Sequence, residues 1–318
     1  MDRKNYIPRI IDSKVDEYLK TFGAVCIEGP KWCGKTWTSS YHCNSEILIG
    51  NPAGNFQNRK LAELSPDLVL EGEVPRLIDE WQEVPPIWDA VRYMVDQRVE
   101  KGQFILTGSA TPNHKGILHS GAGRIGRLRM RPMSLWESGD SSGEVSLGKL
   151  CNGGFAPVMT GEVDLRKLIE YIIRGGWPGS IKLPLEQAAL LPSAYLNAIV
   201  DDDVYRIDGI KRNAAKIRLL LRSLARNEST TATNKTLKNV CCNLNFFFFK
   251  EVDNEDIDVE TVKEYLDIFE RLFITDNQPP FGAGVRSSVR VKQAAKRHFS
   301  DPSLACALLR ATPESLLG

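Results

Sequence analysis

Short apolar runs that end in glycine or a polar residue recur through the first part of the chain. The first run spans residues 24–27 and stops at Gly29, and further runs span residues 68–70, 76–78 and 104–106. Runs of this length, each closed by a break, are typical of buried strands and are too short for helices. Each run therefore predicts a strand that leads into a loop.

Helical spacing separates these runs. Apolar residues repeat at i, i+3, i+4 and i+7 over residues 11–22, and Ile87, Val91, Met94 and Val95 keep the same spacing. Strands that alternate with helices are typical of an α/β domain with a parallel sheet. We therefore expect residues 1–138 to form a three-layer α/β domain.

The pattern changes after this domain. Residues 139–161 are rich in glycine and serine and show no apolar period, which predicts a linker. Beyond it the apolar positions follow helical spacing, and Thr261 with Glu264 has the spacing of a capping box. The predicted helices span residues 165–173, 185–200, 215–226, 237–244 and 262–273.

The last three of these helices suggest a winged helix. They are followed by Phe273-Ile274, a Pro-Pro turn and a short apolar run at 289–291, which is the order of a winged helix-turn-helix. We therefore expect a mostly α-helical, winged-helix-like domain over residues 162–292.

The most specific motif lies between the first predicted strand and a predicted helix. Residues 29–36 fit G-x-x-x-x-G-K-[ST] at every fixed position. In such a loop, backbone N–H groups and the helix N-terminus point at phosphate oxygens, a lysine neutralises the outer phosphates, and a hydroxyl binds Mg²⁺. The predicted nucleotide-binding residues are Gly29, Pro30, Lys31, Trp32, Cys33, Gly34, Lys35, Thr36 and Trp37.

Two adjacent carboxylates follow the strand at 76–78. Asp79 is placed to hold Mg²⁺ together with Thr36, and Glu80 to polarise the water that attacks the γ-phosphate. Side chains of adjacent residues at a strand end splay apart, so one carboxylate can reach the metal and the other the water. The alternative is an ordinary acidic exit from a strand.

Two further positions are candidates for contact with the γ-phosphate. Ser109 closes the next strand, whose tip in a parallel sheet lies beside the two carboxylates. Arg124 belongs to an arginine-rich segment, residues 123–131, and is a candidate arginine finger in cis or from a neighbouring subunit. A plain turn and a solvated basic strand are the competing interpretations of these two features.

Composition narrows the function classes. The chain has 318 residues, 42% apolar side chains and a net charge of +1, so it is an ordinary globular protein with no overall field for nucleic acid or membranes. Seven scattered cysteines and four histidines favour neither disulfides nor a zinc site. No signal peptide or membrane span is evident, and we expect a cytoplasmic protein.

Local charge leaves DNA as one candidate partner. Residues 206–226 and 286–297 are strongly basic, as a phosphate-backbone footprint requires, whereas residues 251–270 are strongly acidic. The acidic segment includes the helix that would have to enter the major groove, which argues against DNA recognition by that helix. The alternatives are that the basic and acidic segments pair with each other, and that the module serves only contacts with an unknown protein partner.

Taken together, these motifs resemble a large family of bacterial and archaeal AAA-type P-loop ATPases with a C-terminal winged-helix region and a domain of unknown function. The resemblance rests on YIPR at 6–9, the P-loop at 29–36, LIDEWQEVP at 77–85, ILTGSA at 105–110, GRIGRLRMRPMSLWE at 123–137 and GGWP at 175–178. It implies ATP and Mg²⁺ as ligands and a sensor role for Ser109. It also implies that residues 293–318 begin a further domain that is truncated here.

Three functions remain open from the sequence. The first is a Mg²⁺-dependent ATPase that uses its nucleotide state to rearrange the winged-helix region, with oligomers required if Arg124 acts in trans. The second is a non-hydrolysing interaction module that ATP stabilises. The third is a small-molecule kinase, which shares the P-loop but does not require the pair Asp79 and Glu80.

Overall fold

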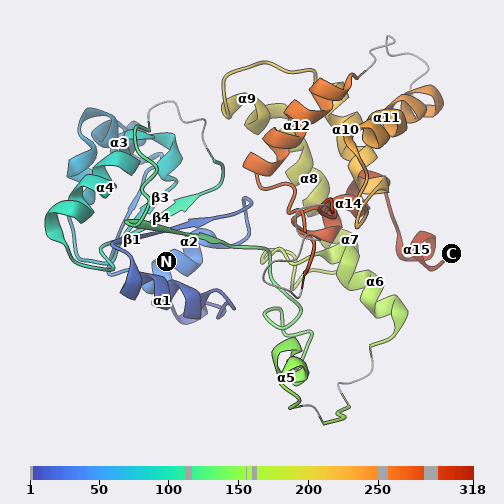
Figure 1. The fold of residues 1–318 in the computed structure, drawn as a ribbon, viewed down its shortest axis with the longest axis horizontal. Helices are drawn as coiled ribbons and strands as arrows, with labels where there is room; N and C mark the ends of the chain where they lie inside the picture. Colours follow the sequence, from blue (N-terminus) through green and yellow to red (C-terminus); the bar gives the residue numbers. More distant parts are fainter. Residues whose placement is uncertain (1–2, 112–116, 155, 160–162, 249–256, 283–292) are drawn as a thin grey trace. The chain divides into compact units, whose positions relative to one another are not determined.

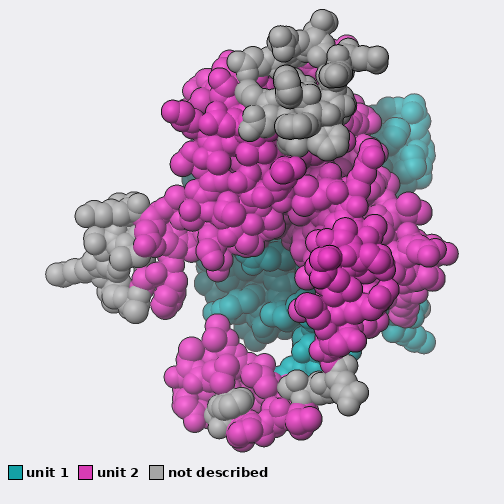
Figure 2. Space-filling model, turned by 90° about the vertical axis from the view of Figure 1, so that its right-hand side faces the viewer, with its two compact units in different colours: residues 1–143 teal, residues 144–318 magenta. Residues whose placement is uncertain are grey.

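The computed structural model describes residues 3–111, 117–154, 156–159, 163–248, 257–282 and 293–318 (Figure 1). The chain forms two compact units, residues 1–143 and 144–318, which Figure 2 colours separately. None of the helices in these described ranges is long and apolar enough to cross a membrane.

The first unit is built on a parallel five-stranded sheet with the strand order β2-β3-β4-β1-β5. A parallel sheet whose strands alternate with helices confirms the predicted α/β P-loop fold class. The strands are β1 (Ala24–Glu28), β2 (Ser45–Leu48), β3 (Arg76–Asp79), β4 (Phe104–Gly108) and β5 (Ile125–Arg129).

Alternate residues of the central strands point into two separate cores. Val25, Ile27 and Leu77 pack on one side with α1 (Asp12–Thr21), which contributes Val15. On the same side, α2 (Lys35–His42) also covers the sheet. Because successive side chains of a strand point to opposite faces, one short apolar run supplies both cores.

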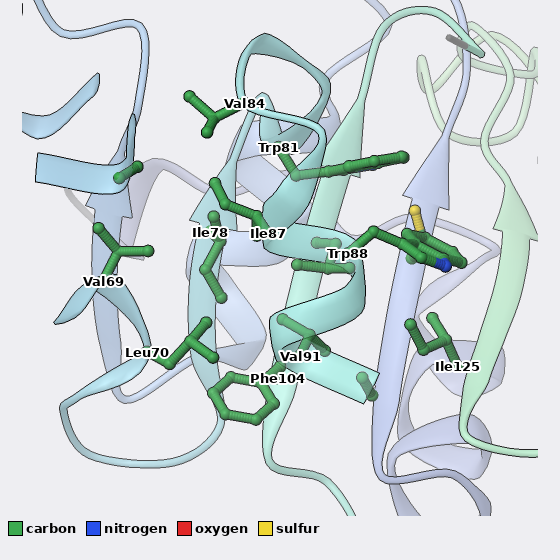
Figure 3. Close-up of a cluster of buried hydrophobic side chains, with 14 of the residues drawn as sticks. Val69, Leu70, Ile78, Trp81, Val84, Ile87, Trp88, Val91, Phe104 and Ile125 are labelled. Carbon is green, nitrogen blue, oxygen red and sulfur yellow. The ribbon is translucent and has the colours of Figure 1, made fainter. Parts of the chain in front are cut away.

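The other core lies between the sheet and α3 (Ala53–Leu64), η2 (Pro66–Leu70) and α4 (Pro86–Arg98). Figure 3 shows Trp81 and Trp88 at its centre, and their ring centroids are 4.8 Å apart. Trp81 belongs to η3 (Trp81–Glu83), the turn that follows β3. This packing fixes the loop after β3 against the sheet.

The structure corrects one prediction in this unit and adds one strand that was not predicted. Residues 68–70 lie in the 3₁₀ helix η2, which begins at Pro66, and do not form a strand. Proline favours the first turn of a helix and cannot donate to a sheet, which explains the difference. The strand β2 was missed because it begins with Ser45 and Glu46 and is only partly buried.

The second unit is helical in the residues that the structure describes. One predicted helix, residues 185–200, is divided into segments 185–188 and 190–198 and the start of a π-helical turn at 199. The first break lies where Pro192 lacks the N–H that would continue the helix. The described helices of the second unit are α5 (Leu147–Cys151), α6 (Leu165–Arg174), α7 (Leu185–Ala188), α8 (Leu190–Ala198), the π-helical η4 (Ile199–Asp203), α9 (Val204–Arg206), α10 (Ala214–Arg226), α11 (Asn234–Phe248), α12 (Val259–Arg271), α14 (Pro302–Leu309) and α15 (Pro313–Leu317). The first unit also contains the short helix η1 (Arg3–Asn5).

The start of α12 differs from the predicted capping box. Asp258 is the N-cap, and its side chain accepts a hydrogen bond of 2.7 Å from the backbone N–H of Thr261. The N-cap thus lies three residues before Thr261, the first residue of the predicted capping box. Aspartate satisfies a free N–H at a helix N-terminus as well as threonine does, and the apolar pattern alone did not distinguish them.

The segments after α12 pair locally. Thr275 bridges to Phe299 and Gln278 to Lys296, both antiparallel. The helix α14 then packs against α6, α8 and α10. The predicted strand at 289–291 lies outside the described residues, so the winged-helix assignment and the predicted boundaries at 139, 162 and 293 stay predictions.

Candidate functional site

The glycine-rich loop of residues 29–36 connects β1 to α2 at the carboxyl end of the sheet. Gly34 has a φ of 104°, in the left-handed region that glycine tolerates. At Gly29 a Cβ atom would lie 2.1 Å from the carbonyl oxygen of Met130, so a side chain is excluded there. The two glycines let the backbone turn tightly between a strand and the first turn of a helix.

Lys35 lies inside this loop. Its side chain is buried, and Nζ donates to the carbonyl oxygens of Gly29 at 2.9 Å and Pro30 at 2.8 Å. The loop thus concentrates a positive charge beside the N-terminus of α2. A helix N-terminus with free N–H groups and a lysine favours an anion such as a phosphate.

Thr36 and Asp79 meet directly. The hydroxyl of Thr36 donates to Oδ1 of Asp79 at 2.8 Å, and the hydroxyl of Thr107 donates to the same oxygen at 2.7 Å. Burial raises the pKa of the Asp79 carboxyl above its ordinary value of 3.8, and the charge of Glu80 adds to the rise. Hydrogen bonds from the two hydroxyls and the charge of Lys35 lower this pKa in part.

Glu80 turns away from the direction of β3. Its backbone is in the left-handed region, with φ 58° and ψ 47°, and its N–H donates to the hydroxyl of Thr107 at 2.9 Å. The carboxylate then reaches the tip of β4, where Oε2 accepts a hydrogen bond of 2.8 Å from Ser109. The left-handed turn therefore aims the carboxylate at the neighbouring strand.

A continuous network thus joins the predicted residues at one edge of the sheet. It runs from Thr36 through Asp79 and Thr107 to Glu80 and Ser109. Lys35 acts on Asp79 through its charge. The carboxyl ends of parallel strands are where ligands bind in open α/β sheets.

Arg124 is not part of this network. It lies just before β5, and its carbonyl oxygen accepts from the N–H of Ala24 at the start of β1. Its side chain pairs with Asp96 of α4 at 2.9 Å. Within one chain, Arg124 is therefore at the amino edge of the sheet, opposite the glycine-rich loop.

The other predicted loop residues divide by exposure. Trp32 and Trp37 are exposed, and Lys31 is half-buried. The Cys33 side chain is buried beside the carbonyl of Met130, and burial raises the pKa of its thiol. Only the backbone of Cys33 can therefore face a ligand.

Sequence reasoning missed two residues that shape this site. Arg9 is buried, and its guanidinium donates to the carbonyl of Cys33 at 2.7 Å and to that of Arg131 at 2.8 Å. It also pairs with Glu137 at 2.9 Å. Arg9 therefore stabilises the backbone of the glycine-rich loop. The only sign of this role in the sequence was an arginine directly after Pro8. The other missed residue is Gln82.

The oxygen donors of this site suit a hard cation. A threonine hydroxyl and a carboxylate are ligands that Mg²⁺ accepts, and Mg²⁺ is usually completed by water and substrate phosphates. Within the ranges that the structure describes, no group of three or more His, Cys, Asp or Glu side chains could hold a metal by itself. Thr36 and Asp79 therefore fit a cation that arrives with a phosphate ligand.

Comparison with known families agrees with this geometry. Residues 21–138 match the model of a family described as an AAA domain, and residues 165–315 match one described as a domain of unknown function (DUF8612). The chain thus matches an AAA domain over its N-terminal part and a DUF8612 domain after it. This confirms the predicted resemblance, and an AAA domain implies nucleotide binding.

A solved structure shares the fold. The Walker-type ATPase of Pyrococcus abyssi is similar to this chain with a TM-score of 0.52 and 13% sequence identity, over 96% of this chain and 97% of the other. At this identity the likeness shows a P-loop ATPase fold and nothing finer.

Two curated relatives carry no assigned function. Uncharacterized proteins of Mycobacterium tuberculosis and Mycobacterium bovis are each 23% identical to this chain over 289 residues, which are 90% of this chain and 56% of the relative. The chain thus spans about half the length of the curated relatives it matches.

Proposed function

We propose that this protein is a Mg²⁺-dependent ATPase. The observation that carries the proposal is the hydrogen bond between Thr36 of the glycine-rich loop and Asp79 at the end of β3. It joins the phosphate-binding loop to a carboxylate at the same sheet edge, with a second carboxylate next to it. A glycine turn that binds no phosphate would not require either carboxylate beside it.

Binding is assigned to the loop and its lysine. Backbone N–H groups of residues 31–36 are assigned to the phosphates, and Lys35 exchanges its carbonyl partners for phosphate oxygens. Thr36 and Asp79 would hold Mg²⁺ when it is bound. Mg²⁺ neutralises charge on the phosphate oxygens when it is bound.

Hydrolysis is assigned to Glu80. A water molecule attacks the γ-phosphorus, and the bond from that phosphorus to the bridging oxygen of the β-phosphate breaks. The Glu80 carboxylate orients the water and accepts its proton. The hydroxyl of Ser109 donates to Oε2 of Glu80 at 2.8 Å. We assign Ser109 to contact with the γ-phosphate or the water.

A link from the loop to the end of the first unit supports a response to nucleotide. Arg9 connects the carbonyl of Cys33 to Glu137, which lies shortly before the boundary at residue 143. We infer that the nucleotide state alters this link and thereby the second unit. ATP rather than GTP follows from the family resemblance.

The charges of the second unit favour a protein partner over DNA. Arg212 is already paired with Asp208 at 2.7 Å and with Glu264 at 2.8 Å, and Arg218 is paired with Asp201 at 2.9 Å. The exposed side of α12 carries Glu264 and other acids. A helix of this charge opposes contact with phosphate backbones.

The decisive variant is Glu80→Gln. It keeps the size of the side chain and removes the proton acceptor, so we expect ATP turnover to fall about 10²-fold or more while ATP binding is retained. Turnover is measured as phosphate release, and binding by calorimetry with ATP and Mg²⁺.

The matched control is Glu83→Gln. Glu83 lies on the same turn but pairs with the exposed Arg59 at 3.2 Å, away from Glu80. It should turn over ATP as the wild type does. Equal turnover by the wild type and Glu80→Gln would instead favour the non-hydrolysing, ATP-stabilised module.

A further inference from the structure

We propose that Gln82 is a positioning residue for the Glu80 carboxylate in ATP hydrolysis. The inference rests on the proposed function and adds a residue to which neither the P-loop motif nor the family match assigns a role. It is carried by the hydrogen bonds that Gln82 makes with Glu80 and Ser109.

The amide of Gln82 closes a ring of three side chains. Its Nε2 donates to Oε2 of Glu80 and, at 3.2 Å, to the hydroxyl of Ser109. The Ser109 hydroxyl in turn donates to the same Oε2 at 2.8 Å. Both donors thus hold the same oxygen of the carboxylate. This fixes the plane of the carboxylate and leaves its other oxygen, Oε1, outside these two hydrogen bonds.

The turn that carries Gln82 is itself fixed. The N–H of Glu83 donates to the carbonyl of Glu80 at 3.0 Å, and that of Val84 donates to Trp81 at 3.1 Å. Trp81 is almost fully buried and packs against Trp88 in the core. Gln82 therefore acts from a rigid support, as a residue that orients another group requires.

The neighbouring strand leaves space for this amide. A Cβ atom on Gly108 would lie 3.4 Å from Oε1 of Gln82 and 3.1 Å from Nε1 of Trp81. The absence of a side chain at Gly108 therefore lets the turn after β3 lie directly against the tip of β4. The spacing of Thr107, Gly108 and Ser109 serves both carboxylates at once.

Glu80 sets the orientation of the Gln82 amide, although this orientation does not satisfy every hydrogen-bonding atom of the amide. Oε1 of Gln82 is buried and has no hydrogen-bond partner among the described residues. Turning the amide over would place Oε1 against the negative oxygen of Glu80, which is repulsive. A buried amide that keeps one end unsatisfied while it donates to a carboxylate is best explained by its effect on that carboxylate.

Positioning gives Gln82 a defined kinetic effect. A carboxylate that rotates freely spends less time aligned with the attacking water, and small displacements of a reacting group cost large factors in rate. Gln82 lies beside Glu80 and does not belong to the glycine-rich loop. Its loss should therefore lower kcat and leave the KM for ATP unchanged.

The test is Gln82→Met, which keeps the length of the side chain and removes the donor. We expect kcat to fall about 10- to 100-fold, with KM for ATP within about twofold of wild type. Gln82→Asn, whose amide is one methylene shorter, should behave in the same way. Glu83→Gln on the same turn is the control and should keep the kcat of the wild type.

A second measurement separates positioning from a general loss of structure. In a Glu80→Gln background, Gln82→Met should lower the residual rate no further, because the group that it positions has been removed. An equal loss in both backgrounds, an unchanged kcat in Gln82→Met, or a raised KM with unchanged kcat would each overturn the inference. Should the wild type turn over ATP no faster than Glu80→Gln, the proposed function itself would fail.

Discussion

Asp79 in the first unit is half-buried and Asp301 in the second is buried, and mainly different kinds of donor hold the two aspartates. Asp79 accepts from the hydroxyls of Thr36 and Thr107. Asp301 accepts from the backbone N–H of Gly176 at 2.8 Å and of Ser303 at 2.9 Å, and also from the Ser303 hydroxyl. Burial raises the pKa of both carboxyls.

The difference in donors separates a reactive carboxylate from a structural one. Hydroxyl groups can rotate, so the oxygens of Asp79 can be released to a cation and its water. Backbone N–H groups are fixed by the fold, and those around Asp301 join the loop at Gly176 to the start of α14. Burial and a raised pKa alone therefore do not identify a functional acid, because structural groups show both.

Between the two aspartates, the larger effect on activity is expected for Asp79→Asn. The amide can accept both hydroxyl hydrogen bonds but lacks the charge that holds Mg²⁺, so kcat/KM should fall about 10²-fold. Because the variant removes a buried charge that burial disfavours, its stability should equal or exceed that of the wild type. Turnover over a Mg²⁺ titration and urea unfolding give the two values.

Chelation of Mg²⁺ provides the control for this variant. EDTA should abolish turnover in the wild type. In Asp79→Asn, whose turnover is already low, EDTA should cause little further loss of turnover. A wild-type rate that persists in EDTA, or an Asp79→Asn protein that is strongly destabilised, would show that Asp79 serves the fold as Asp301 does.

The reverse pattern is expected for Asp301→Asn. One end of the amide would place an N–H against a backbone N–H, which leaves a buried donor unpaired and costs about 2 kcal/mol of unfolding free energy. Turnover measured well below the unfolding temperature should stay close to wild type. Urea unfolding followed by circular dichroism, with Asp79→Asn as the matched variant, tests this difference.

The pH dependence of stability gives an independent check of Asp301. Burial raises its pKa in the folded state above the ordinary 3.8, while Arg174 and the hydrogen bonds lower it in part. The folded state therefore binds the proton more tightly than the unfolded state, and stability falls as the pH rises from about 3.8 through the folded pKa. Asp301→Asn should lack this fall, and an identical profile in both proteins would contradict it.

Most of the α/β unit could be predicted because its strands are short apolar runs that end at glycine or acidic residues. Three of the five strands, β1, β3 and β4, follow this rule. β5 alternates arginine with apolar residues, and β2 begins with Ser45 and Glu46 at a partly buried edge. The run at 68–70 has the right composition for a strand, but Pro66 directs it into a 3₁₀ helix. Apolar composition thus reports burial better than it reports backbone conformation.

The candidate site divides in the same way. Lys35, Thr36, Asp79 and Glu80 could be placed because a motif and a strand end fix their backbone positions. Gln82 could not, because its contact with Glu80 depends on a left-handed turn that no periodicity reveals. The position of Arg124 at the amino edge could not be predicted, because an arginine-rich strand does not show which of its ends lies near the loop, and a role for Arg124 in trans stays a prediction.

The smallest effect is expected for Arg124→Ala, which extends the comparison to an exposed polar contact. Arg124 pairs with Asp96 at the amino edge of the sheet, and its side chain is 48% exposed. Exposed pairs of this kind contribute little to stability. In a single chain the variant should therefore keep wild-type kcat, measured at low protein concentration.

Protein concentration decides whether Arg124 acts on a neighbouring subunit. An arginine finger supplied in trans requires turnover per subunit to rise with concentration in the wild type and to stay flat in Arg124→Ala. Equal rates at every concentration would assign Arg124 to its ion pair with Asp96 alone. Any arginine that contacts the γ-phosphate within the chain would then have to come from the carboxyl edge, where β5 ends at Arg129.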